Sequence, residues 1–237
     1  MFIELTDHLR CPADHPESYL VLIPDAMQGR RVLSGILGCP ECHAEYRITD
    51  AILDFTPAAE SPSRDRGPHG STLARPGPEG IHQGRAATEG PLGAHWRDWG
   101  PRESIRANPA IDSNAILALL GLDGPGGYLG LVGNAVRFAT GLSAGLPGAH
   151  LVAINPPTGT QPSAELSIVH SPRIPVKARS LRGVVVGLPI AAEPDWQTAA
   201  IRAVLPGLRA TGEGPIPVLE GFELLGAADG WWVGRAP

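Results

Sequence analysis

The fold of this chain is decided by one stretch, Gly127-Tyr128-Leu129-Gly130-Leu131-Val132-Gly133-Asn134-Ala135-Val136-Arg137-Phe138-Ala139. Its apolar run breaks at Gly133-Asn134 and then continues with apolar residues at helical spacing. This pattern indicates a buried strand that turns into a helix, as in an open α/β sheet. In such sheets a ligand binds just beyond the carboxyl end of the strand, in the turn that opens the helix. The turn at Gly133 is therefore the first place to look for a ligand.

The chain around this stretch alternates between strand-like and helical patterns. Residues 116–120 form a helical run that Asp112 or Ser113 could cap and that Gly121 would end. Further strands are predicted at 151–154, 166–169, 184–188, 216–219, 222–225 and 231–233, and further helices at 135–144 and 195–209. Such alternation predicts a mostly parallel sheet with right-handed crossovers. Residues 226–230, between the last two strands, have hairpin length, so one of these strands must run antiparallel.

Composition and charge bound the domain organisation and the classes of partner. The chain has 237 residues, of which 43% are hydrophobic, enough to bury a core. Residues 57–94 are rich in Pro, Gly, Ala, Ser and Arg, which predicts a linker between a small domain at 1–56 and an α/β domain at 95–237. Trp96 and Trp99 share one helical face, which predicts a contact between the two domains. The formal charge of −5 argues against a nucleic-acid partner.

Three cysteines lie in two Cys-Pro turns on either side of a predicted hairpin. An odd number of cysteines with a C-x-x-C pair favours a cytosolic metal site over a disulfide framework. Imidazole is the commonest companion of three thiolates around zinc, so a nearby histidine is the preferred fourth ligand. The predicted zinc ligands are Cys11, His15, Cys39 and Cys42. Asp14, at the C-x-x-C spacing from Cys11, and His43, beside Cys42, remain the alternatives to His15.

The same segment resembles a known family. Two stretches are similar to the small zinc-ribbon proteins that bind and activate tRNA and protein methyltransferases. They are Leu5-Thr6-Asp7-His8-Leu9-Arg10-Cys11-Pro12 and Gly38-Cys39-Pro40-Glu41-Cys42-His43-Ala44-Glu45-Tyr46-Arg47-Ile48-Thr49-Asp50-Ala51-Ile52. The resemblance covers about residues 1–56. It implies a zinc ribbon whose role is partnership with a methyltransferase fold rather than catalysis. The chain departs from the family at Asp14-His15, where many members have a fourth cysteine.

The remainder, roughly residues 110–237, resembles the class I S-adenosylmethionine-dependent methyltransferases. The features that carry this resemblance are the strand and turn at 128–138, the helix at 196–208, and the closing strands at 222–225 and 231–234. It implies S-adenosylmethionine as cofactor. The fold class expected for the whole chain is α/β, a Rossmann-like, mostly parallel sheet with a C-terminal antiparallel hairpin, plus a small N-terminal zinc-ribbon domain.

The residues at the expected cofactor site differ from this family's pattern. In the family, the first strand carries an acid that receives the cofactor's ammonium, whereas this chain has Gly130. The turn after that strand keeps Gly133 and continues with Asn134, and the acid that binds the ribose is replaced by Asn155, which lacks charge assistance. Residues 187–190, after the fourth strand, offer no acid, base or amide, so no catalytic residue is predicted. The degenerate cofactor site therefore consists of Gly130, Gly133, Asn134 and Asn155, and we expect no tight binding of S-adenosylmethionine.

These patterns favour a methyltransferase-like pseudoenzyme with a zinc-ribbon module, acting as a non-catalytic scaffold or partner subunit. The alternatives are an active methyltransferase with an atypical cofactor loop and a zinc-ribbon protein that binds nucleic acid. We expect a protein partner or self-association. No membrane association is expected, because the most apolar stretches, such as 115–122, are too short to span a bilayer. No signal-peptide pattern is present, so a cytoplasmic location is expected.

Overall fold

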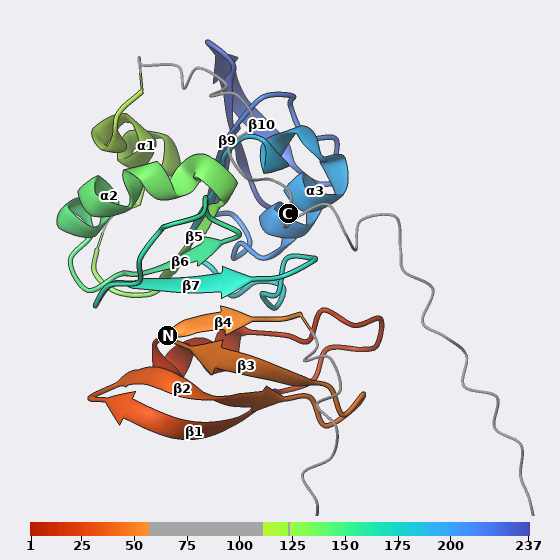
Figure 1. Ribbon diagram of the computed structural model, residues 1–237. Helices are drawn as coiled ribbons and strands as arrows, with labels where there is room; N and C mark the ends of the chain where they lie inside the picture. Colours follow the sequence, from red (N-terminus) through yellow and green to blue (C-terminus); the bar gives the residue numbers. More distant parts are fainter. Residues whose placement is uncertain (57–110, 123) are drawn as a thin grey trace, which may run out of the picture.

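The computed structural model describes residues 1–56, 111–122 and 124–237. Within these residues, eleven strands form one sheet in the order β1-β2-β3-β4-β7-β6-β5-β8-β9-β11-β10. Figure 1 shows the N-terminal strands below and the helix-covered C-terminal strands above. The predicted linker at 57–94 and the predicted contact through Trp96 and Trp99 lie outside the described residues.

The N-terminal part is a four-stranded antiparallel meander preceded by a short helix. Its elements are η1 (Ile3–His8), β1 (Val21–Gln28), β2 (Arg31–Gly38), β3 (Glu45–Thr49) and β4 (Ile52–Asp54). In β3, Tyr46 and Ile48 are buried while their neighbours are exposed, so strict alternation places one face of the strand against the core. The hairpin predicted from the two alternating runs before Cys39 is confirmed as β1 and β2.

The C-terminal part carries the parallel strands and the helices. Its elements are α1 (Ser113–Leu120), β5 (Tyr128–Val132), η3 (Gly133–Phe138), α2 (Ala139–Gly145), β6 (His150–Ile154), β7 (Leu166–His170), β8 (Gly183–Val186), η4 (Ile190–Ala192), α3 (Pro194–Arg202), β9 (Arg209–Glu213), β10 (Glu223–Ala228) and β11 (Trp231–Arg235). Strands β7, β6, β5, β8 and β9 run parallel, and β11 is antiparallel to both β9 and β10. This arrangement confirms the predicted Rossmann-like sheet with an antiparallel C-terminal hairpin. The cap predicted for the first helix is also confirmed, because the Asp112 side chain accepts a hydrogen bond from the Ala115 N–H.

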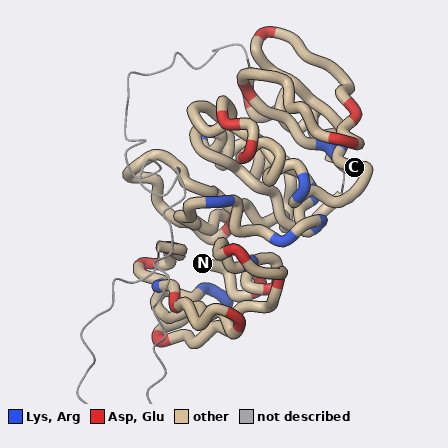
Figure 2. The backbone as a smooth tube through the Cα atoms, turned by 90° about the vertical axis from the view of Figure 1, so that its right-hand side faces the viewer, with Lys and Arg blue, Asp and Glu red and all other residues tan. Residues whose placement is uncertain are grey.

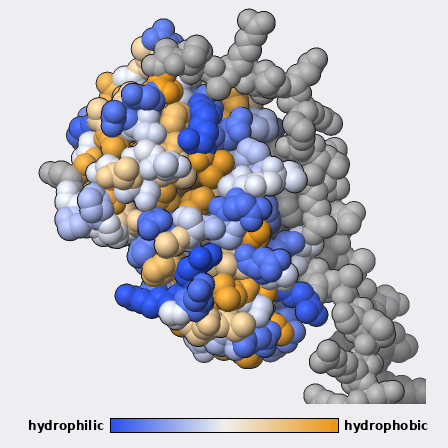
Figure 3. Space-filling view, turned by 60° about the vertical axis from the view of Figure 1, so that its left-hand side comes forward, coloured by the Kyte–Doolittle hydropathy of each residue, from blue (hydrophilic) through white to orange (hydrophobic). Residues whose placement is uncertain are grey.

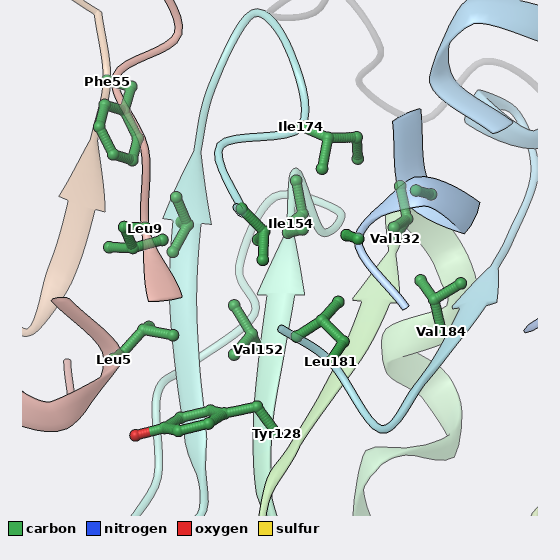
Figure 4. Close-up of a cluster of buried hydrophobic side chains, with 14 of the residues drawn as sticks. Leu5, Leu9, Phe55, Tyr128, Val132, Val152, Ile154, Ile174, Leu181 and Val184 are labelled. Carbon is green, nitrogen blue, oxygen red and sulfur yellow. The ribbon is translucent and has the colours of Figure 1, made fainter. Parts of the chain in front are cut away.

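The two faces of the parallel strands are covered in different ways. Helices α1 and α2 pack on one face, where Leu129 and Leu131 of β5 are buried. On the opposite face, Val132 and Ile154 pack with the irregular segment 171–182 and with the N-terminal part, including η1 (Figure 4). Within the described residues, no helix connects β6 to β7 or β7 to β8. These connections contain Pro156, Pro157, Pro172 and Pro175, and proline disfavours a helix interior.

The two parts of the chain share one sheet and one core. Strand β4 pairs in parallel with β7, with Ile52 opposite Ile168 and Leu53 opposite Val169. The Phe55 N–H then donates to the His170 carbonyl at 2.8 Å. We call this junction the β4–β7 seam. Sequence patterns do not predict it, because a single three-residue strand carries no information about which edge it joins.

In the C-terminal part, one predicted strand is wrong and one real strand was missed. Residues 216–219 form no strand, because Pro215 and Pro217 remove backbone donors from that segment, and Val218 is 98% exposed. The strand that was missed is β9, which begins at Arg209, the last residue of the helix predicted at 195–209. The observed helix, α3, ends at Arg202. Strand β9 has no large apolar residue, because Gly212 must leave room for Trp232: a Cβ on Gly212 would lie 2.7 Å from the indole ring.

Candidate metal centre and the turn after β5

Four side chains from two loops converge at one end of the N-terminal sheet. Cys11 follows η1, His15 lies four residues later, and Cys39 and Cys42 lie in the turn between β2 and β3. Their ligand atoms all lie within 4.8 Å of one another. The turn is held as a compact knuckle, because the Cys39 N–H donates to the Ala44 carbonyl and the His43 N–H donates to the Cys39 carbonyl. Three thiols and one imidazole could hold a zinc ion at this place.

The orientation of the His15 ring suits a metal ligand. Its Nδ1 lies 2.7 Å from the Pro16 carbonyl, which accepts the hydrogen bond, so Nδ1 carries the proton. Nε2 then presents its lone pair to Cys39 Sγ, 3.3 Å away. A backbone acceptor on the other ring nitrogen is the usual way in which a ligating histidine is held. The alternatives, Asp14 and His43, are not in the four-residue group among the described residues.

The thiols differ in how readily they ionise. Burial raises the pKa of Cys11 to about 11, against the opposing effect of the Tyr46 hydroxyl. At Cys39 burial also acts to raise the pKa, but hydrogen bonds from the backbone of Cys42 and Glu41 lower it to about 7. Of these two thiols, Cys39 therefore offers a thiolate to an incoming metal more easily than Cys11 does.

Tyr46 is a member of this centre that the sequence prediction missed. Its hydroxyl lies 3.0 Å from Cys11 Sγ, and the residue is 2% exposed. Burial, and then the contact with Cys11, raise the pKa of Tyr46, so the hydroxyl keeps its proton. Its alternating position on a strand directly after the C-x-x-C turn was the available signal, but an inward-facing tyrosine is more commonly a core residue.

The turn after β5 is closed by the loop that follows β8. The Gly187 N–H donates to the Val132 carbonyl at 2.9 Å, and the Asn134 N–H donates to the Leu188 carbonyl at 3.3 Å. The approach is close, since a Cβ on Gly187 would lie 2.4 Å from the Ala135 nitrogen. Gly133 adopts a positive φ of 62°, which glycine allows, and the Gly187 carbonyl faces it. The Asn134 N–H of this turn is therefore used within the protein.

The other two predicted cofactor residues, Gly130 and Asn155, are also engaged in contacts within the protein. Gly130 lies in the buried strand β5, and a Cβ at this position would lie 3.0 Å from Leu181 Cδ1 and 3.1 Å from Val184 Cγ2. Asn155, 9% exposed, donates through Nδ2 to the Ser171 carbonyl and accepts from the Ser171 N–H. The structure thus places Gly133 and Asn134 against the β8 loop, Gly130 in the core and Asn155 in a bridge between the β6 and β7 ends.

A partly buried ion pair at the same edge of the sheet was not predicted. The Arg137 guanidinium donates to Glu213 Oε1 at 2.7 Å, and the Leu188 N–H donates to Oε2 of the same carboxylate at 3.1 Å. The pair therefore ties η3, the β8 loop and the end of β9 together. Partners that lie 76 residues apart carry no local sequence signal.

Two cavities within the described residues lie away from this edge. One, of about 440 Å³, lies between α1 and the β10–β11 hairpin and is lined by residues that include Leu119 and Trp231. The other, of about 330 Å³, lies between α2 and the amino-terminal ends of β6 and β7, beside Leu151 and Leu166. Neither is lined by any of the four predicted cofactor residues.

Comparison with known proteins gives similarity of fold only. No family model and no curated protein matches the chain. Among solved structures, it is similar to the antibiotic-resistance methyltransferase Kmr, with 14% identity, a TM-score of 0.34, and coverage of 55% of this chain and 95% of that one. A SAM-dependent methyltransferase from Aquifex aeolicus has 12% identity, a TM-score of 0.38, and coverage of 53% and 90%. Phosphoethanolamine N-methyltransferase 2 of Haemonchus contortus has 16% identity and a TM-score of 0.35, and the match spans 46% of this chain and 30% of that one.

The methyltransferase-like fold rests on the strand order and directions of the C-terminal part. None of the helices in the described parts of the chain has the length and apolar character needed to cross a membrane.

Proposed function

We propose that this chain is a methyltransferase-like pseudoenzyme with a zinc-binding module, and that it acts as a non-catalytic scaffold or partner subunit. The observation that carries the proposal is the closure of the turn after β5. The Asn134 N–H, which an open turn would offer to a ligand, is bonded to the Leu188 carbonyl instead. A cofactor would have to displace the β8 loop before it could reach the turn.

Energetics also disfavour the cofactor. S-adenosylmethionine carries a sulfonium and an ammonium, and a site that removes them from water must return charge or hydrogen bonds. Gly130 returns neither, and both polar ends of the Asn155 amide are bonded to Ser171. Each lost charge-assisted hydrogen bond costs about 1.5–3 kcal/mol. Two such losses turn a micromolar site into one of roughly millimolar affinity or weaker, at about 1.4 kcal/mol per tenfold.

The donor set of the metal centre supports the zinc part of the proposal. Cys11, His15, Cys39 and Cys42 supply one ligand atom each, as a closed structural zinc site requires. Zinc would contribute folding free energy, on the order of 10 kcal/mol of apparent binding free energy in small zinc modules. With all four positions filled by protein, such a site stabilises the fold and leaves no position for a substrate. Thiolate ligands suit a reducing compartment, which places the protein in the cytoplasm within this proposal.

Exposed apolar side chains support the scaffold role. Figure 3 shows hydrophobic residues at the surface of the N-terminal part. On the edge strand β1 and just before it, Tyr19, Val21 and Ile23 are 68%, 44% and 60% exposed. Within this proposal, that surface meets a protein partner or a second copy. Both signs of charge occur on each part of the molecule (Figure 2), which favours a protein over a nucleic acid.

Isothermal titration calorimetry of the zinc-loaded protein tests the proposal. Titration with S-adenosylmethionine and with S-adenosylhomocysteine should give no binding tighter than about 1 mM. An active methyltransferase, measured in the same buffer, serves as the positive control for both ligands. A dissociation constant below about 50 μM for either ligand would show that the closed turn opens readily and that the pseudoenzyme proposal is wrong.

A further inference from the structure

Tyr46 connects the metal centre with the junction between the two parts of the chain. Its hydroxyl lies 3.0 Å from Cys11 Sγ. A thiolate bound to a metal has lone pairs and no proton, whereas the phenol O–H is a hydrogen-bond donor. In a metal-loaded centre, the Tyr46 hydroxyl therefore donates to Cys11.

The ring of Tyr46 continues this connection toward the seam. It packs edge-on against Phe55, with the ring centroids 4.7 Å apart. Phe55 directly follows β4, and Figure 4 shows it on the N-terminal side of the buried cluster, beside the strand that β4 joins. Its backbone N–H donates to the His170 carbonyl at the end of β7. Cys11, Tyr46, Phe55 and His170 thus form one uninterrupted series of contacts.

A second connection leads from the same ligand to the C-terminal part. The Arg10 N–H, one residue before Cys11, donates to the Pro175 carbonyl at 2.9 Å. Leu9 forms a bridge with Val176 and is fully buried in the shared core. The loop that presents Cys11 is therefore attached on one side to the metal centre and on the other to the segment after β7.

We propose that Tyr46 is a positioning residue that couples metal occupancy to the β4–β7 seam, so that the metal determines whether the two parts form one continuous sheet. This inference rests on the zinc centre of the proposed function. Strand β4 has three residues, the short end of the usual range for strands. Its parallel pairing with β7 therefore depends on support from β3 and the rest of the N-terminal sheet. With the metal bound, Cys11 fixes Tyr46, and Tyr46 supports Phe55 at the end of β4. Without the metal, the loops at Cys11 and at Cys39–Cys42 lose their link, and the seam loses that support.

The Tyr46→Phe variant tests the coupling at the metal. It keeps the ring against Phe55 and removes only the hydroxyl. Loss of a partner that orients a metal ligand typically costs about 10–100-fold in metal affinity, so chelator competition should show a decrease of about that size. Tyr19→Phe, at a tyrosine that is 68% exposed, is the matched control and should bind zinc as the unaltered protein does. Zinc affinity of Tyr46→Phe within about twofold of the control would overturn the inference.

Cobalt substitution separates a role at the metal from a general loss of stability. A hydrogen bond to a thiolate lowers the energy of the sulfur lone pairs, so removing it should move the thiolate-to-cobalt charge-transfer band to longer wavelength. The Tyr46→Phe spectrum should show this shift and the Tyr19→Phe spectrum should not. An unshifted band in Tyr46→Phe would overturn the hydrogen bond to the bound thiolate.

Hydrogen exchange tests the coupling at the seam. The full chain is measured zinc-loaded and after chelation, and peptides that cover β7 and β4 are compared with peptides that cover β5 and β8. Chelation should raise exchange in β4 and β7 at least about tenfold more than in β5, because the β5 bonds are made only within the C-terminal part. Equal protection of β7 with and without zinc would overturn the inference. Failure of the unaltered protein to bind zinc would instead refute the metal part of the proposed function.

Discussion

Adding a side chain at Gly130 tests whether the expected cofactor position is filled by protein. The residue lies in the buried strand β5, and a Cβ there would meet Leu181 Cδ1 at 3.0 Å and Val184 Cγ2 at 3.1 Å. Both neighbours are buried, at 1% exposed each. Overpacking of this kind costs about 1–3 kcal/mol, and the lower flexibility of alanine returns about 0.5–1 kcal/mol. Gly130→Ala should therefore destabilise the protein by at most about 2.5 kcal/mol.

Gly130→Asp restores the acid that the resemblance leads one to expect, and it should be far more costly. A carboxylate placed among Leu181 and Val184 gains no partner, and burying an unpaired ion adds a penalty of several kcal/mol. For a chain of this size, about 1 kcal/mol corresponds to roughly 2–4 °C in Tm, so the Asp variant should melt more than about 10 °C lower. Urea and thermal unfolding of the two variants and the parent give these values. A Gly130→Asp protein as stable as the parent, and able to bind S-adenosylhomocysteine, would refute the reasoning.

Three further outcomes are expected. Glu213→Gln should lower the free energy of unfolding by about 3 kcal/mol. This is the lower end of the cost of breaking a buried ion pair, because Arg137 is 26% exposed. Urea unfolding that shows no loss would contradict the role of this ion pair in holding η3, the β8 loop and the end of β9 together. Burial lowers the pKa of His8 below its usual 6.5, so the folded state favours the neutral ring, and the stability it contributes above pH 6.5 should be lost as the pH falls below that value. His8→Phe should remove this part of the pH dependence in urea unfolding, and an unchanged pH profile would contradict it. Ile23→Lys should weaken self-association or partner binding, measured by light scattering after size exclusion. Val218→Lys, at another exposed apolar residue, should not. Equal effects would contradict a specific role for the surface formed by Tyr19, Val21 and Ile23.

The sequence predicted the elements whose signals are local. The glycine break at Gly133 and the apolar run before it located β5 and its turn correctly. The helix cap at Asp112 follows from residue type in the same way. The C-terminal hairpin was predicted from the length of residues 226–230, but β10 runs to Ala228 and the turn is Asp229-Gly230, where both residues have positive φ. The two Cys-Pro turns indicated the metal centre, and the structure brings the four predicted ligand residues together.

The features that were not predicted depend on long-range packing. Strand β9 consists of small and polar residues because its neighbour supplies Trp232, a fact that is invisible within the strand itself. The β4–β7 seam joins two strand edges across a long sequence separation, and no local pattern selects that pairing. Tyr46 follows the alternation of any buried strand, and only its distance from Cys11 reveals its connection with the metal centre.

The state of two amides tests the central claim, the closure of the turn after β5, most directly. Nuclear magnetic resonance of the zinc-loaded protein can follow hydrogen exchange at the Asn134 and Gly187 N–H groups, which donate to the Leu188 and Val132 carbonyls. Both should be protected without ligand, and their exchange rates and chemical shifts should not change when S-adenosylhomocysteine is added. An Asn134 amide that exchanges freely and becomes protected on addition of S-adenosylhomocysteine would contradict the account.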